Sequence, residues 1–311
     1  MEKILLTGAT GFVGKELAIK LLEKKYEVHT LERYVTGRYS FEGDAKIINH
    51  HGSLTDYAAI KHIIKDVKPD FVLHLAAISP VSFSYDHYME VTEANYLGTI
   101  NLAEACFREV KNFKQFIFAG TSEEYGMSLQ TTKDMLKEDS PLLPNSPYAI
   151  AKVAADIYLR YMHSAYGFPV TIMRPYNTYG RKDNSHFFIE RTITQMLRGN
   201  KVYLGDRGTV RDWLYIDDHV NGYIKAIGNK KAVGEVVQLC TGKGYTTEET
   251  ANIIARLTGF KGDVVWNSTP KRPLDAKILI GDNSKAKRIL GWEPKYDLES
   301  GLKMTIDYWR K

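Results

Sequence analysis

Tyr148 and Lys152 are four residues apart, and their types suit proton transfer. Residues at this spacing lie on one face of an α-helix. A nearby ammonium group stabilises a phenolate and lowers the pKa of a tyrosine, which can then act as a general base near neutral pH. Pro147 favours a helix that begins here. Such pairs are common by chance, so this one indicates catalysis only together with a second motif.

The second motif is the run Gly8-Ala9-Thr10-Gly11-Phe12-Val13-Gly14. It follows a predicted strand and opens a predicted helix, so its glycines would let a pyrophosphate approach the backbone and the helix N-terminus. This context predicts a dinucleotide site rather than a tight turn with packing glycines. A Walker loop is excluded, because Ala9 stands where its first glycine is needed and Glu16 where its Ser or Thr is needed.

The second predicted strand ends at Glu32, and Arg33 follows directly. An acidic side chain here accepts hydrogen bonds from the adenosine ribose hydroxyls and repels a 2′-phosphate, which favours NAD. Arg33 could instead bind that phosphate, so NADP stays open. We expect NAD.

Short β-rich runs alternate with longer helical stretches, and this alternation predicts an α/β fold with a Rossmann doubly wound parallel sheet. The predicted strands are residues 3–7, 27–32, 45–49, 70–75, 113–119, 170–174 and 235–240. The predicted helices are residues 12–24, 56–65, 88–110, 148–166, 247–258 and 297–309. We expect a dinucleotide-binding domain at 1–175 plus about 212–242. A smaller discontinuous α/β lobe at about 176–211 and 243–311 would bind the substrate.

The composition excludes several other classes of protein. The 311 residues carry a net charge of +5 without a dense basic block, which disfavours a nucleic-acid partner. No apolar run is long enough to span a bilayer, so we expect no membrane segment. Cys106 and Cys240 are far apart and no secretory signal precedes them, which favours free thiols and a cytoplasmic location. We expect no metal site.

Together with the glycine loop, Thr121, Tyr148 and Lys152 resemble the Ser/Thr–Tyr–Lys catalytic set of the extended short-chain dehydrogenases, the NAD-dependent epimerase/dehydratase family. Further segments in the family's order are His74-Leu75-Ala76-Ala77, Asn95-Tyr96-Leu97-Gly98-Thr99, Arg174-Pro175-Tyr176-Asn177-Thr178-Tyr179-Gly180 and Arg211-Asp212-Trp213-Leu214-Tyr215-Ile216-Asp217-Asp218. The resemblance runs from Lys3 to the end of the chain. It implies an enzyme that acts on a nucleotide-diphosphate sugar.

The resemblance also implies the residues of the site. The cofactor-binding residues would be Gly8, Thr10, Gly11, Phe12, Val13, Gly14, Glu32, Arg33, Ser53, Leu54, Leu75, Ala76, Ala77, Asn95, Tyr148, Lys152 and Pro175. The substrate-binding residues would be Ser79, Ser122, Asn177, Arg211 and Arg272. One departure is Ser53, because the family often has an aspartate there that contacts the adenine amine.

Glu123, two residues after Thr121, distinguishes the reactions of the family. A 4,6-dehydratase needs an extra acid/base to remove the C5 proton and expel the 6-hydroxyl, whereas typical 4-epimerases lack the acid. Thr121-Ser122-Glu123 resembles the segment of GDP-mannose 4,6-dehydratases. We therefore expect a nucleotide-sugar 4,6-dehydratase of this type. A 4-keto-6-deoxysugar reductase is the next alternative, since some of these carry an acid here and have a similar length, and a 4-epimerase is the third.

Two other interpretations compete with a dehydratase. Glu123 could be a solvated loop charge. A non-catalytic NAD(P)-sensing protein of the same fold is disfavoured, because such proteins tend to lose the Tyr/Lys pair. The resemblance further implies a homodimer through a four-helix bundle, built from the helix around residues 95–110 and the Tyr148 helix of each subunit. Ile157 and Leu159 would suit that interface or the chain's own core equally well.

Overall fold

A seven-stranded parallel sheet forms the larger part of the molecule, in the order β10-β6-β5-β4-β1-β2-β3. The computed structural model describes residues 1–33, 46–128, 135–269 and 272–311. The strands are β1 Lys3–Thr7, β2 Glu27–Glu32, β3 Ile47–His51, β4 Phe71–His74, β5 Gln115–Ala119, β6 Val170–Pro175 and β10 Val236–Leu239. The order runs outward in both directions from the β1–β4 pair, which confirms the predicted doubly wound α/β fold.

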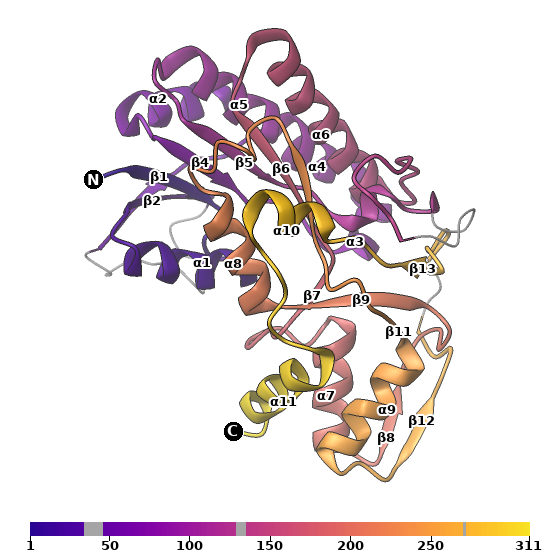
Figure 1. The fold of residues 1–311 in the computed structure, drawn as a ribbon. Helices are drawn as coiled ribbons and strands as arrows, with labels where there is room; N and C mark the ends of the chain where they lie inside the picture. The colour runs from indigo at the N-terminus through magenta and orange to yellow at the C-terminus, as the bar shows by residue number, and fades with distance from the viewer. Residues whose placement is uncertain (34–45, 129–134, 270–271) are drawn as a thin grey trace.

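Helices cover both faces of this sheet, with α2, α5 and α6 on one face and α1 and α8 on the other (Figure 1). Their bounds are α1 Phe12–Glu23, α2 Tyr57–Val67, α5 Gly98–Glu109, α6 Pro147–Tyr166 and α8 Ile216–Ala226. Successive strand residues point to opposite faces, so Leu5 packs in one hydrophobic core and Leu6 in the other. The apolar residues of both faces are therefore buried, as a parallel sheet requires.

The predicted long helix at 88–110 is interrupted. The structure has α4 Tyr88–Thr92, a π-helical turn η1 Glu93–Leu97, and then α5. Within that turn the Asn95 side chain is fully buried and bonds to the backbone of Ile78. A π-helical turn inserts one residue into the helical repeat and often marks a functional site. It is invisible to periodicity, because the apolar positions on either side still fit a helix.

The third strand begins later than predicted, at Ile47 instead of residue 45, which lies outside the described residues. Its parallel register pairs Val28 with Ile47 and Glu32 with His51, so β3 ends level with the carboxyl end of β2. The strand also continues two residues beyond the predicted end at residue 49, to His51. The hydrophobic pattern did not indicate this extension, because residues 49–51 are polar.

A smaller lobe lies below the large sheet in Figure 1, where α7, α9 and α11 gather around short strands. Its helices are α7 Phe188–Arg198, α9 Thr247–Thr258 and α11 Leu298–Trp309, and its strands are β7 Asn177–Tyr179, β8 Lys201–Tyr203, β9 Val210–Tyr215, β11 Gly244–Thr246, β12 Asp263–Val265 and β13 Ile278–Leu279. The bounds of α9 are those predicted. Four helices were not predicted from the sequence: α7, α8, α10 Ser284–Leu290 and the short α3 Val81–Asp86. Although the prediction assigns α10 to the substrate lobe, it packs against β10 and α8.

Among the described residues, no helix is long and apolar enough to cross a membrane and no cluster of His, Cys, Asp or Glu could hold a metal ion. Cys106 and Cys240 are free and buried.

Candidate active site

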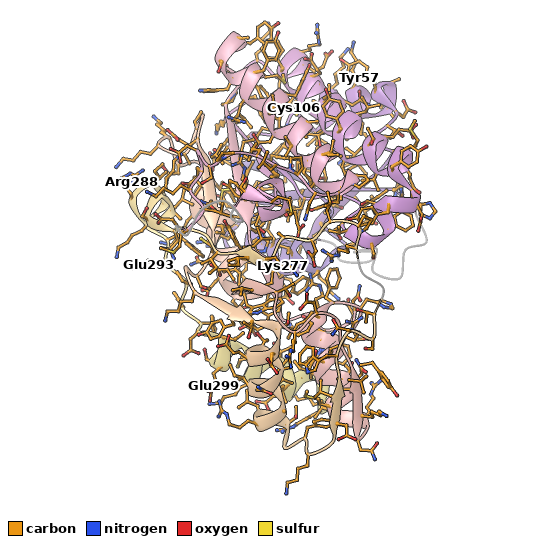
Figure 2. All side chains as sticks on the ribbon, turned by 90° about the vertical axis from the view of Figure 1, so that its right-hand side faces the viewer. Tyr57, Cys106, Lys277, Arg288, Glu293 and Glu299 are labelled. Atoms are coloured by element: carbon orange, nitrogen blue, oxygen red, sulfur yellow. The ribbon has the colours of Figure 1, made fainter. Side chains whose placement is uncertain are left out.

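One cavity of about 1690 Å³ lies where the loops after β1, β4, β5 and β6 meet the smaller lobe. Ligands of open α/β sheets bind at the carboxyl ends of the strands, next to the point where the strand order reverses. Figure 2 shows Lys277, which lines the cavity, between the layer that carries Tyr57 and Cys106 and the lobe that carries Glu299. Every predicted site residue except Asn95 lines this cavity.

The glycine loop forms a cradle that tolerates no side chain at two positions. A Cβ on Gly14 would lie 2.0 Å from the carbonyl oxygen of Gly8, and one on Gly8 would lie 2.6 Å from the amide nitrogen of Ala76. Gly8 also has a φ of +74°, which favours glycine. The loop closes with a hydrogen bond of 3.0 Å from Gly11 N to Gly8 O and leads directly into α1. The helix N-terminus therefore presents free N–H groups to a pyrophosphate.

Glu32 stands at the adenosine end of the cavity. The residue is buried, and its Oε1 has no hydrogen-bond partner in the part of the chain that the structure describes. An unpaired buried carboxylate oxygen suits the ribose hydroxyls of NAD. Arg33 is exposed at the rim. The Ser53 hydroxyl bonds to the Thr55 hydroxyl at 2.8 Å, so it is less available to the adenine amine than an aspartate carboxylate would be.

Tyr148 and Lys152 lie on α6 as predicted, and both are buried. Lys152 Nζ donates to the carbonyl oxygen of Ala119 at 2.7 Å and lies 4.7 Å from the Phe118 ring centre. Burial lowers the pKa of Lys152 to about 8, against the opposing charge of Glu124. The site lysine is therefore held by the end of β5.

The prediction that Lys152 lowers the pKa of Tyr148 is wrong for the protein alone. Burial, followed by the charge of Glu123, raises the pKa of Tyr148, while a hydrogen bond with Thr121 acts in the opposite direction. The spacing of four residues placed the lysine correctly on the helix. It carried no information about the desolvation that dominates inside the folded site.

Two adjacent glutamates of the turn after β5 have different surroundings. Glu124 Oε1 accepts from Thr121 N at 2.9 Å in a capping box, and its other oxygen lies 2.9 Å from Arg174 Nε. Arg174 is itself held by Asp156 at 2.9 Å. Glu123 lines the cavity, is 8% exposed, and its Oε2 has no partner among the described residues. Burial and the charge of Asp156 raise the pKa of Glu124 to about 8, and Glu124 does not line the cavity, so its role is structural. Glu123 faces the cavity and is available for chemistry.

Asn95 is the exception among the predicted cofactor contacts. It does not line the cavity, and both ends of its amide bond to Ile78, at 2.8 Å to the backbone nitrogen and 3.0 Å to the carbonyl oxygen. Contrary to the prediction, Asn95 therefore does not face the cofactor cavity, and it instead holds the loop after β4. His74 serves a similar purpose, with hydrogen bonds to Thr7 at 2.7 Å and Thr99 at 2.9 Å.

The substrate side of the cavity carries cations from the smaller lobe. Arg211 lies 3.0 Å from Asp275, and Arg272 lies 3.6 Å from the same carboxylate, so one acid holds the two predicted arginines together. Asn177 Oδ1 is buried without a partner in the described chain. Ser79 is exposed at the mouth and Ser122 is buried, and both line the cavity.

Many residues that line the cavity were not among the predicted site residues, and Arg191, His219 and Tyr223 are three of them. Arg191 on α7 has a buried Nε, and His219 and Tyr223 on α8 have a buried Nε2 and hydroxyl; none of these atoms has a partner among the described residues. The helices that carry them were not recognised in the sequence. The position of His219 directly after the Arg211–Asp218 signature was the one available signal.

A parallel doubly wound sheet, a glycine cradle at the start of α1 and a buried Tyr/Lys pair facing the same cavity define a dinucleotide-dependent oxidoreductase-type enzyme. The family model described as GDP-mannose 4,6 dehydratase matches residues 5–305. The chain therefore belongs to the nucleotide-sugar epimerase/dehydratase family of extended short-chain dehydrogenases.

Relatives with different reactions resemble it about equally. A GDP-mannose 4,6-dehydratase from Vibrio cholerae is 30% identical, over 96% of this chain and 91% of its own length. A UDP-glucose 4-epimerase from Thermotoga maritima, solved with UDP-glucose, has a TM-score of 0.89 and 33% identity, over 99% and 98% of the two chains. A dTDP-glucose 4,6-dehydratase from Bacillus anthracis, solved with NAD, has a TM-score of 0.86 and 26% identity, over 99% and 96%. These matches show the family without deciding between its reactions.

Proposed function

We propose that the protein is a nucleotide-sugar 4,6-dehydratase, with GDP-mannose as the first substrate to test. The observation that supports it best is Glu123, a buried carboxylate that lines the cavity beside Tyr148 and has an oxygen without a partner among the described residues. A solvated loop charge would be exposed. Elimination of water across C5 and C6 needs such a group, whereas inversion at C4 does not.

The cofactor is NAD. The glycine cradle fits a pyrophosphate, and the unpaired Glu32 oxygen fits the unmodified ribose. Gly8, Thr10, Gly11, Phe12, Val13 and Gly14 would hold the diphosphate, and Leu75, Ala76, Ala77 and Pro175 would flank the rest. When bound in its oxidised form, NAD supplies a hydride acceptor and a positive charge that favours the tyrosine phenolate.

Tyr148 takes the proton from the sugar 4-hydroxyl as C4 is oxidised, and Thr121 hydrogen-bonds the same oxygen. Lys152, held at the Ala119 carbonyl, keeps positive charge near the phenolate. Glu123 then removes the C5 proton and assists departure of the 6-hydroxyl as water. Tyr148 is buried and packs with Val91 and Ala151, which limits the access of bulk water to these proton transfers.

Arg211 and Arg272 would bind the diphosphate of the sugar nucleotide, with Asn177 and Ser122 closer to the sugar. Both arginines share Asp275, so they reach the substrate as a preformed pair. A dianionic diphosphate between two guanidinium groups makes charge-assisted hydrogen bonds that a neutral ligand cannot replace.

A 4-epimerase is the second candidate, because the Thermotoga maritima epimerase is the solved structure with the higher TM-score of the two described above. The test is to incubate the purified protein with GDP-mannose, dTDP-glucose, UDP-glucose or UDP-N-acetylglucosamine, without added cofactor, and to follow product masses. Loss of one water from any of them supports the dehydratase and names its substrate. An unchanged mass with a new epimer supports the epimerase. No reaction, followed by turnover of a 4-keto-6-deoxysugar nucleotide with NAD(P)H, supports the reductase.

We also propose a cytoplasmic homodimer. Leu159 is fully buried in the chain's own core, but Ile157 on the same helix is 51% exposed, which separates two positions that the sequence pattern could not. Ile150, Tyr161 and Leu97 extend the exposed apolar surface over α6 and the π-helical turn. An apolar patch of this kind favours association with a second copy.

A further inference from the structure

His219 and Tyr223 lie one turn apart on α8, and their roles are not explained by the reaction described above. Their rings stack with centres 5.2 Å apart. Both residues line the cavity, His219 at 5% exposure and Tyr223 at 0%. His219 Nε2 and the Tyr223 hydroxyl have no hydrogen-bond partner in the described chain. Buried polar atoms are nearly always paired, so two adjacent unpaired atoms at a cavity wall indicate a ligand.

The hydrogen bonds of Thr178 assign the tautomer of His219. The Thr178 hydroxyl donates to the carbonyl oxygen of Tyr176 at 3.0 Å, so its oxygen is left to accept from His219 Nδ1 at 2.8 Å. Nδ1 therefore carries the proton, and Nε2 is an acceptor. Burial lowers the pKa of His219 to about 3, so the ring stays neutral at physiological pH. The pair thus offers one acceptor, Nε2, and one donor, the Tyr223 hydroxyl.

The position of the pair indicates which part of a ligand it meets. Tyr223 is close enough to Tyr148 for the charge of Tyr148 to raise the pKa of Tyr223, and both residues line the cavity. The helix α8 packs against α1, which begins at the glycine cradle, and against β7, which follows Pro175. The arginines assigned to the sugar nucleotide come from the other lobe. The pair therefore belongs to the reactive end of the dinucleotide.

We propose that His219 and Tyr223 recognise the primary carboxamide of the nicotinamide ring, with the amide N–H donating to His219 Nε2 and the amide oxygen accepting from Tyr223. An amide presents one donor and one acceptor on adjacent atoms, which matches this pair. A carboxylate in its place would face the Nε2 lone pair without a proton between them. The inference rests on the proposed function for the placement of NAD.

The test compares three ligands by calorimetry on the full chain freed of co-purifying dinucleotide: NAD, its nicotinic-acid analogue with a carboxylate, and ADP-ribose, which lacks the ring. Loss of one net hydrogen bond is worth about 0.5–1.5 kcal/mol. We expect Tyr223→Phe to weaken NAD binding about twofold to tenfold and to leave ADP-ribose binding unchanged. His219→Phe should reduce the wild-type preference for NAD over the nicotinic-acid analogue. Tyr158→Phe, which removes a hydroxyl bonded to Glu104 outside this cavity, is the matched control.

Equal losses of NAD and ADP-ribose in Tyr223→Phe would overturn the proposal, since they would indicate a general packing defect. An unchanged NAD affinity would also overturn it, as an internal water could then satisfy both atoms. The wild-type comparison needs no variant: equal affinity for NAD and its nicotinic-acid analogue contradicts carboxamide recognition but leaves the dehydratase intact. Failure of the wild type to bind NAD or ADP-ribose would instead overturn the proposed function along with it.

Discussion

Glu123→Gln should separate the two halves of the proposed reaction. The substitution keeps the size and hydrogen-bonding shape of the side chain and removes its capacity to accept a proton. A positioned acid/base contributes a factor of about 10²–10⁴, or roughly 3–5 kcal/mol of transition-state stabilisation. The neighbouring Glu124 cannot take over, because it does not line the cavity and its Oε1 accepts from Thr121 N. We therefore expect water elimination to fall by that full factor.

The assay follows two signals in the same reaction with the substrate found by mass. One is loss of water from the sugar nucleotide, and the other is uptake of solvent deuterium at C5. Both should fall together in Glu123→Gln, whereas Glu93→Gln, which removes an exposed carboxylate that also lines the cavity, should behave as wild type. Deuterium uptake at the wild-type rate in Glu123→Gln would refute the assignment of Glu123 as the C5 base.

The same variant makes a prediction about pH. The charge of Glu123 raises the pKa of Tyr148, so its removal should lower that pKa. Oxidation at C4 needs the phenolate, so its rate rises with pH through the Tyr148 pKa. In Glu123→Gln this rise should occur at lower pH than in the wild type, measured as residual C4 oxidation in a single turnover. A rise at the same or higher pH would contradict the electrostatic coupling.

Three further changes test the framework. Gly14→Ala should weaken NAD binding about fivefold to a hundredfold, since the new Cβ overlaps a backbone carbonyl and overpacking of this kind costs about 1–3 kcal/mol; calorimetry would measure it, and binding as tight as that of the wild type would contradict the cradle. Arg174→Leu should cost about 3–5 kcal/mol in urea unfolding, because it removes the buried cation beside Glu124 and leaves Asp156 paired with Arg160 alone; a loss below about 1 kcal/mol would mean that the two acids do not depend on the charge of Arg174. Ile157→Asp should give a monomer by light scattering, while a dimer that persists would rule out the α6 surface.

The fold was largely predictable because its βαβ units follow local rules. The glycine loop, the Tyr148 helix and α9 all carry a start signal at their first residues: a glycine cradle, Pro147 after a Ser146 cap, and a capping box between Thr246 and Glu249. Each signal acts over four residues or fewer, so it can be read from the sequence. Tertiary context changed little at these points.

The unpredicted parts depend on contacts between distant segments. Helix α8 starts one residue after β9 ends and opens with two aspartates, so no loop separates strand from helix in the sequence. The direction of the Tyr148 pKa depends on burial, which spacing cannot reveal. Asn95 matched a family position but bonds to Ile78, seventeen residues away. Sequence motifs placed the residues on the correct elements, and three-dimensional packing decided which of them reach the cavity.

The cost imposed by Glu123 is itself an argument about the reaction. Its charge works against the first step, because it makes the Tyr148 phenolate harder to form. A 4-epimerase uses only that step and its reverse, so a buried, unpaired carboxylate beside the base would slow it and bring no benefit. A dehydratase needs the same carboxylate for the second step, at C5 and C6. The structure provides a neighbouring arginine, Arg174, yet directs it to Glu124 and leaves Glu123 uncompensated. This arrangement suits an enzyme whose tyrosine is harder to deprotonate but which gains a group that can eliminate water.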